Sequence, residues 1–292
     1  MNRPSTAGLS AGSVRTARKR RVAARPLAFQ VLMCALALLA IFPIYSMVAT
    51  SFEGSADIAG SGIPYPHPYG GNYQAVMQGV NLSQTVGNSV LIVCCTEALV
   101  VLFGSMLGYV VGRARRGPFQ WLYLWFLTGL IIPFQATMVP LFRLQILLHL
   151  SNTRAFIILY YVGGAMPFAM LLYAGFMKGI PRELEEAATV DGCGPLRLFW
   201  SIVFPLLMPA TGTLVVVTVF GYWNDFMAPL LFLQDTSKYT LITQIFNFEQ
   251  EHTADFGPIF AICTLAMVPI MLFFLFTQKY LIRGLTQGAL KG

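Results

Sequence analysis

The sequence predicts an all-α integral membrane protein with six transmembrane helices. The chain has 292 residues, of which 56% are hydrophobic and only 11% are charged, a balance outside the range of soluble domains. It also contains six long apolar runs, and a bilayer core about 30 Å thick needs roughly 20 such residues per helix. The runs are continuous rather than alternating, which favours helices over barrel strands. One membrane domain, residues 27–283, is therefore expected between tails 1–26 and 284–292.

The first apolar run follows basic residues, as a secretory signal does, but it is too long and lacks a small-x-small cleavage site, so we expect it to be retained. The six spans are placed at Leu27–Ser51, Asn88–Val111, Trp121–Phe142, Ala155–Phe176, Ile202–Leu233 and Ile259–Tyr280. Prolines within or beside three of these spans predict kinks or helix ends. They are Pro133, Pro140, Pro205, Pro209 and Pro269.

The distribution of basic residues predicts the orientation, because cytoplasmic loops keep Lys and Arg. Of the 19 Lys and Arg residues, all but Arg143, Arg154 and Lys238 fall on one side of the predicted spans. Both termini and the 178–200 loop are therefore expected in the cytoplasm. The net charge of +7 is then an insertion signal rather than the footprint of a nucleic-acid-binding protein.

Two outer loops differ in character. Residues 52–84 carry several prolines and glycines with aromatics between them, which predicts an ordered loop held by turns. Residues 234–258 carry Glu249, Glu251 and Asp255 and form an acidic loop. Either loop could face a soluble partner or be simply solvated.

A short helix is predicted at residues 182–190, inside the cytoplasmic loop. Pro181 suits a first helical position, three glutamates complement the positive end of the helix dipole, and Gly192 supplies a stop. Gly194-Pro195 then restarts a helix that runs into the fifth span. Such a helix is either a docking element for another protein or a solvated loop helix.

Two stripes of side chains follow from the helical period. Glu183 and Glu186 lie three residues apart on one stripe, where a carboxylate could meet an arginine of a partner. A neighbouring side contains two alanines, which would let the helix approach a groove closely; its residues are Leu184, Ala187, Ala188 and Asp191.

The stretch "EEAATVDG", followed nine residues later by "IVFP", resembles the EAA motif of ATP-binding-cassette importer permeases. Six positions match in type and spacing, whereas Phe204 replaces the usual leucine. "YWNDFMAPLLFLQD" and the sequence through the sixth span are similar to the MalG-like subunits of carbohydrate importers, so the resemblance covers most of the chain. The matching positions are Glu186, Ala187, Ala188, Gly192, Ile202 and Pro205.

The resemblance implies a type I importer permease fold with a cytoplasmic coupling helix, in the bacterial inner membrane. It implies a second, MalF-like permease, two ATP-binding subunits that hold ATP and Mg²⁺, and an extracytoplasmic sugar-binding protein. The C-terminal tail, with Gly284, Gly288 and Lys291, would reach toward the ATPase. A helix continuous with the fifth span would convert ATPase closure into tilting of the spans. The coupling residues expected on this basis are Glu183, Glu186, Ala187, Ala188, Asp191, Gly192, Ile202 and Pro205.

Other polar and small residues lie in or near the spans. Glu97 either lines a pathway or contacts a partner, or is a protonated side chain bonded to a neighbouring helix. Trp223, Asn224 and Asp225 are expected near the outer surface as an outer gate or binding-protein contact, with interfacial anchoring as the alternative. A small-residue stripe on the second span predicts close helix packing and no further role. It consists of Gly104, Gly108 and Gly112.

Signatures of chemistry are missing from the sequence. It has no phosphate-binding G-x-x-x-x-G-K-[ST] motif, its three histidines are scattered, and its five cysteines show no metal-ligand spacing. We therefore expect a transport subunit that binds no metal or cofactor and catalyses no reaction. Two rivals remain: a permease of the same fold for a non-sugar solute, and a secondary transporter driven by an ion gradient through Glu97.

Overall fold

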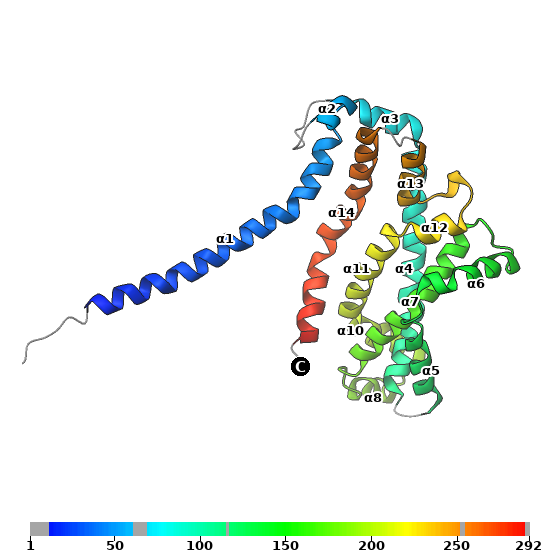
Figure 1. The fold of residues 1–292 in the computed structure, drawn as a ribbon. Helices are drawn as coiled ribbons and strands as arrows, with labels where there is room; N and C mark the ends of the chain where they lie inside the picture. The colour runs from blue at the N-terminus through cyan, green and yellow to red at the C-terminus, as the bar shows by residue number, and fades with distance from the viewer. Residues whose placement is uncertain (1–11, 61–68, 115–116, 252–254, 290–292) are drawn as a thin grey trace, which may run out of the picture.

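The computed structural model describes the chain apart from residues 1–11, 61–68, 115–116, 252–254 and 290–292 (Figure 1). All regular secondary structure in the described residues is helical, which confirms the all-α part of the predicted class. Four of these helices are long and apolar enough to cross a membrane, and they correspond to the first, second, fourth and sixth predicted spans. They are α1 (Gly12–Thr50), α4 (Leu82–Arg113), α7 (Arg154–Met177) and α14 (Phe256–Ala289).

The two terminal helices extend beyond the predicted spans. Helix α1 begins at Gly12, inside the segment expected to be a tail, and continues without a break through Leu27. Helix α14 includes Gly284 and Gly288, whereas Lys291 lies outside the described residues. Side chains along α1 from Leu27 to Tyr45 are mostly exposed, because most of this helix extends away from the other helices (Figure 1).

The third predicted span is wrong as a single helix. The structure divides Trp121–Phe142 between α5 (Pro118–Thr128) and α6 (Phe134–Leu147), with a break at residues 129–133. Pro133 explains the break, because it has no N–H to donate to the carbonyl of Gly129 and it disfavours a helical Ile132.

The fifth predicted span, Ile202–Leu233, is also wrong as a straight helix. Helix α9 (Pro195–Leu198), a π-helical turn at Phe199–Val203 and α10 (Phe204–Leu206) form one arm. This arm bends by 71° from α11 (Met208–Asn224), and a short α12 (Met227–Phe232) follows. Pro205 and Pro209 each lack the N–H that a continuous helix would need, so the bend lies between them.

The packing of α4 against α7 confirms the predicted role of the glycine stripe. A Cβ atom added to Gly104 would lie 2.7 Å from Ala169 Cβ, and one added to Gly112 would lie 2.7 Å from Met177 Cβ. A Cβ atom on Gly108 would overlap Tyr173 Cβ. The backbones of α4 and α7 can therefore lie this close only because these three positions are glycines. The two helices form a rigid pair.

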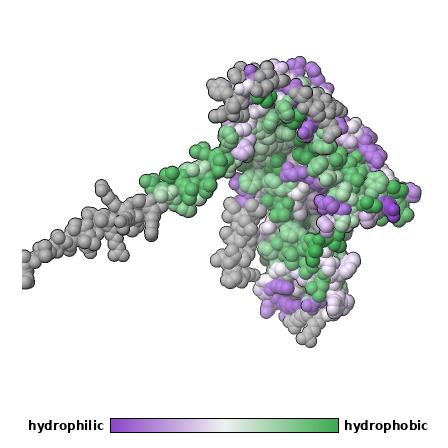
Figure 2. Space-filling model, in the orientation of Figure 1, coloured by the Kyte–Doolittle hydropathy of each residue, from purple (hydrophilic) through white to green (hydrophobic). Residues whose placement is uncertain are grey.

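Short helices cover one end of the molecule, opposite α8 (Glu183–Val190) (Figure 1). They are α2 (Ser55–Gly60), α3 (Gly71–Gly79) and α13 (Leu241–Glu251). The described parts of the 52–84 loop therefore include two helices in addition to the turns that the sequence predicts. Asn72 ties α3 to the end of α1, because its amide donates to the carbonyls of Ser51 (2.9 Å) and Glu53 (2.8 Å). Figure 2 shows hydrophilic residues gathered at both of these ends, with a mainly hydrophobic surface between them.

Candidate functional site

Helix α8 lies almost where the sequence predicts it, but Pro181 precedes the helix rather than opening it. The helix ends in a glycine cap. Gly192 has a φ of 80°, which glycine adopts without strain. The Cys193 N–H donates to the Ala188 carbonyl (2.9 Å) and the Gly192 N–H to the Thr189 carbonyl (3.0 Å). These two bonds form a Schellman motif, which stops the helix and turns the chain toward α9.

The predicted docking side of α8 is divided by the structure. Ala188 is only 7% exposed and packs into a cluster with Leu198 and Phe199, so it faces this chain's own core. Its small side chain lets α8 lie close to the arm formed by α9 and the π turn. Leu184, Ala187 and Asp191 remain exposed.

We define the exposed face of α8 as the side chains of Glu183, Leu184, Glu186, Ala187 and Val190, all of which are exposed to solvent. Val190 is 87% exposed, although it is strongly apolar. Glu183 and Glu186 make no side-chain hydrogen bond or ion pair within the described residues. Apolar side chains beside unpaired carboxylates suit a protein partner that carries cationic groups.

Glu185 and Arg113 form a contact that the sequence analysis missed. Their side chains make an ion pair and are each 15% exposed, and Arg113 Nε donates to Glu185 Oε1 at 2.6 Å. The Tyr109 hydroxyl also donates to Glu185 Oε2, at 3.0 Å. Glu185 lies three residues before Ala188 on the same inward face, so the helical period would have identified it once Ala188 was known to be buried.

Arg113 also connects α8 to the end of α7. Its Nη1 donates to the carbonyls of Met177 and Ile180, each at 3.0 Å. In return, Arg182 Nη2 donates to the Arg113 carbonyl at 2.8 Å. Helix α8 is therefore held to the rigid pair of α4 and α7. We call this group of contacts, made by Arg113, Arg182 and Glu185, the Arg113 anchor.

The path from α8 to the fifth span is less direct than expected. The chain passes through Gly192–Gly194, the π turn and the 71° bend before it reaches α11. Ile202 is half-buried in the cluster that contains Ala188, and Pro205 lies in α10 beside the bend. These two residues shape the connection and do not belong to the exposed face of α8. Rigid continuity between α8 and the fifth span was therefore a wrong expectation.

Glu97 is 8% exposed and accepts a 2.5 Å hydrogen bond from Thr218 Oγ1 of α11. This geometry favours the alternative in which the glutamate bonds to a neighbouring helix. Trp223 is buried in a cluster with Val93 and Leu241, so it packs the core and does not anchor at a lipid interface. Asn224 and Asp225 instead line a cavity of about 580 Å³ between α7 and α11, and Glu97 does not.

Within the described residues, no group of three or more His, Cys, Asp or Glu side chains could hold a metal ion. Glu183 and Glu186 are instead exposed along one side of α8, whereas Glu185 pairs with Arg113. This arrangement suits contact with a protein surface.

Residues 101–287 match the family described as binding-protein-dependent transport system inner membrane component. The chain belongs to this family. The matched segment contains α8, the glycine cap at Gly192 and the bend at Leu207, and it agrees with the resemblance found in the EAA-like stretch.

Relatives of this inner membrane component cover nearly the whole chain. It is 32% identical over 257 residues, 88% of this chain and 93% of the relative, to a probable starch degradation products transport system permease protein of Thermoanaerobacterium thermosulfurigenes. It is 33% identical, over 86% of this chain and 91% of the relative, to a melibiose/raffinose/stachyose import permease protein of Bacillus subtilis. A chain from the crystal structure of a bacterial ABC transporter involved in import of the acidic polysaccharide alginate shares the fold. That match has a TM-score of 0.75 and 19% identity, and covers 94% of this chain and 99% of the other.

Proposed function

We propose that this inner membrane component is the permease subunit of an ATP-driven importer that carries an oligosaccharide or related carbohydrate across the bacterial inner membrane. One observation carries the proposal: α8 presents an unpaired acidic and apolar face outward while the Arg113 anchor fixes its other face to α4 and α7. The relatives are named as permeases for sugars, which supports the substrate class.

We infer six membrane crossings, with α5 and α6 together forming the third. In Figure 1, α5 lies near α8 and α6 lies nearer to α12, so together they extend along much of the length of α7. An even number of crossings places both termini on one side, and the basic residues place that side in the cytoplasm. The end of α14, with Gly284 and Gly288, then lies on the same side as α8.

Mechanical coupling follows from the contacts of α8. When two ATPase subunits close on ATP, a partner docked on Glu183 and Glu186 moves α8. The Arg113 anchor passes this movement to α4 and α7, and the bend at Leu207 allows α11 to change its tilt. Small rigid-body shifts of this kind open a central pathway alternately to either side.

The remaining subunits are proposed on the same basis. A second, MalF-like permease would complete the pathway, two separate subunits would hold ATP and Mg²⁺, and an extracytoplasmic protein would deliver the sugar. A solved alginate transporter of the same fold was crystallised with a periplasmic protein bound to an alginate pentasaccharide. In this chain, no described residue that lines the cavity between α7 and α11 is Lys or Arg, which favours a neutral sugar over an acidic one.

Reconstitution tests the proposal. The complete transporter and its binding protein, in proteoliposomes, should import at least one of maltose, raffinose, arabinotriose and diacetylchitobiose. Uptake should need internal ATP, stop with vanadate and persist when an ionophore collapses ion gradients. Uptake that ignores vanadate but is lost with the ionophore and in Glu97→Gln would contradict it and indicate a secondary transporter. If the transporter imported only amino acids or phosphate, that result would contradict the proposed sugar substrate.

A further inference from the structure

The cavity between α7 and α11 has an unusual lining for a membrane-spanning region. It measures about 580 Å³, and five of its lining residues are aromatic. Gly164 on α7 and Gly221 on α11 open it further, because a Cβ atom added to either glycine would meet nothing within 4 Å. The aromatic residues are Tyr160, Tyr161, Phe168, Phe220 and Tyr222.

The tyrosines form an ordered group. The rings of Tyr161 and Tyr222 stack with centroids 4.6 Å apart and an interplanar angle of 25°. Tyr160 lies beside them, 5.4 Å from the Tyr161 ring. Asp225 fixes the group, because one carboxylate oxygen accepts from the Tyr161 hydroxyl at 3.0 Å and the other accepts from the Met227 N–H at 2.9 Å. The arrangement is therefore preorganised before any ligand enters.

The lining contains polar groups that are already hydrogen-bonded and two that are not. The Tyr222 hydroxyl donates to the Tyr161 carbonyl at 3.4 Å, and the Asn224 amide nitrogen donates to the Phe220 carbonyl at 2.9 Å. In the described part of the chain, the Tyr160 hydroxyl and the Asn224 amide oxygen have no hydrogen-bond partner. Unpaired polar groups on a membrane domain normally face water, a partner or a ligand, because lipid cannot satisfy them.

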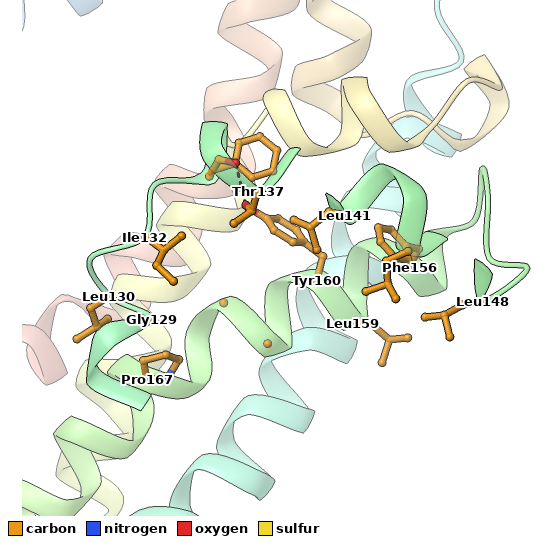
Figure 3. A pocket seen from close by; sticks show the side chains of 14 residues that line it. Gly129, Leu130, Ile132, Thr137, Leu141, Leu148, Phe156, Leu159, Tyr160 and Pro167 are labelled. Carbon is orange, nitrogen blue, oxygen red and sulfur yellow. Dashed lines mark hydrogen bonds between the residues drawn. The ribbon is translucent and has the colours of Figure 1, made fainter. Parts of the chain in front are cut away.

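A neighbouring cavity provides a contrast. It measures about 620 Å³, shares Tyr160 and Gly164 with the first, and is lined mainly by leucine, isoleucine and phenylalanine (Figure 3). Its Thr137 hydroxyl is already satisfied, because it donates to the Phe134 carbonyl at 2.8 Å. This second cavity suits apolar side chains or lipid. Aromatic faces together with free polar groups distinguish the cavity between α7 and α11.

We propose that the cavity between α7 and α11 is a subsite for one neutral sugar ring of the transported substrate. A pyranose has apolar C–H faces and hydroxyls around its edge, so it matches the ring of Tyr160 with the Tyr160 hydroxyl and the Asn224 amide oxygen nearby. This inference rests on the proposed function and adds that the subunit itself contacts the sugar during transport.

Two substitutions of Tyr160 test the subsite in the complete transporter with its binding protein in proteoliposomes. The probe is whichever of maltose, raffinose, arabinotriose and diacetylchitobiose the unmodified transporter imports best. Tyr160→Leu removes the ring face and the hydroxyl, so we expect KM for uptake to rise about three- to tenfold. Tyr160→Phe keeps the ring and should raise KM less. ATP hydrolysis stimulated by the binding protein should stay unchanged in both.

Phe103→Leu is the matched control, because Phe103 is an exposed aromatic residue of α4 that lines neither cavity. Equal KM values for Tyr160→Leu, Phe103→Leu and the unmodified transporter would overturn the subsite while leaving the sugar transport function intact. Loss of the second permease subunit from the purified Tyr160→Leu complex would also overturn it, because the cavity would then be a subunit interface. Failure of the unmodified transporter to import any of the sugars would overturn the proposed function itself.

Discussion

Glu186→Lys is expected to abolish sugar import while the chain still inserts and folds. Glu186 is exposed and makes no side-chain hydrogen bond or ion pair in the described residues, so its replacement should change folding stability by less than about 0.5 kcal/mol. Reversal of its charge would place a lysine against the cationic groups expected on the ATPase. Disrupting such an interfacial charge contact costs about 2–5 kcal/mol, so uptake should fall at least about 30-fold. Radiolabelled sugar uptake and co-purification of the ATPase measure the two effects.

Two controls separate charge from position. Glu186→Gln keeps the shape and removes the charge, so it should retain more activity than Glu186→Lys. Asp57→Lys makes the same charge reversal on an exposed residue of α2, at the opposite end of the molecule, and should leave ATPase binding unchanged. Wild-type uptake by Glu186→Lys would show that this carboxylate does not contact the ATPase.

Arg113→Gln is expected to uncouple ATP hydrolysis from import. The substitution removes the ion pair with Glu185 and the bonds to the Met177 and Ile180 carbonyls, so the attachment of α8 to α4 and α7 would weaken. The Tyr109–Glu185 bond and the bond from Arg182 to the backbone carbonyl of residue 113 would remain. Breaking a buried ion pair costs about 3–5 kcal/mol, and the partial exposure of this pair lowers the expectation to about 2 kcal/mol. Import per ATP hydrolysed should therefore fall at least about tenfold. Parallel assays of ATP hydrolysis and sugar uptake in proteoliposomes give this ratio.

A double-mutant cycle assigns the effect to the anchor. Glu185→Gln should be milder than Arg113→Gln, because Arg113 would keep its carbonyl contacts, and the double variant should be no worse than Arg113→Gln alone. Arg197→Gln is the control, since Arg197 is an exposed arginine of α9 with no side-chain hydrogen bond or ion pair among the described residues. Strictly additive losses for Arg113→Gln and Glu185→Gln would contradict a shared anchor.

Local signals in the sequence were enough to predict α8 and its glycine cap. The acidic residues of the first turn favour the start of α8 and Gly192 favours its end. Both effects are local, so the order of the residues is enough to predict them. The close packing at the glycine stripe on α4 could also be predicted from the sequence, because the spacing of the three glycines places them on one face of the helix. The apolar lengths of α1, α4, α7 and α14 likewise needed no tertiary information.

Long-range geometry could not be read in the same way. Arg113 and Glu185 are 72 residues apart. Arg113 was already explained as one of the basic residues that set the orientation, and Glu185 as an acidic residue in the first turn of a helix, so nothing in the sequence indicated that they pair. Pro205 and Pro209 predicted a kink but neither its 71° angle nor the π turn before it. Trp223 and Asn224 are adjacent in sequence, yet one is in the core and the other lines a cavity, and only the packing of α11 between its neighbours separates them.

A photo-crosslinking amino acid at Val190 tests the central claim most directly, because this side chain projects from the exposed face of α8. The same probe at Met77, exposed on α3 at the opposite end, is the control. In membranes that are importing sugar, the probe at Val190 should form an adduct with the ATP-hydrolysing subunit, and the probe at Met77 should not. Normal import with no such adduct from Val190 would contradict α8 as the docking helix.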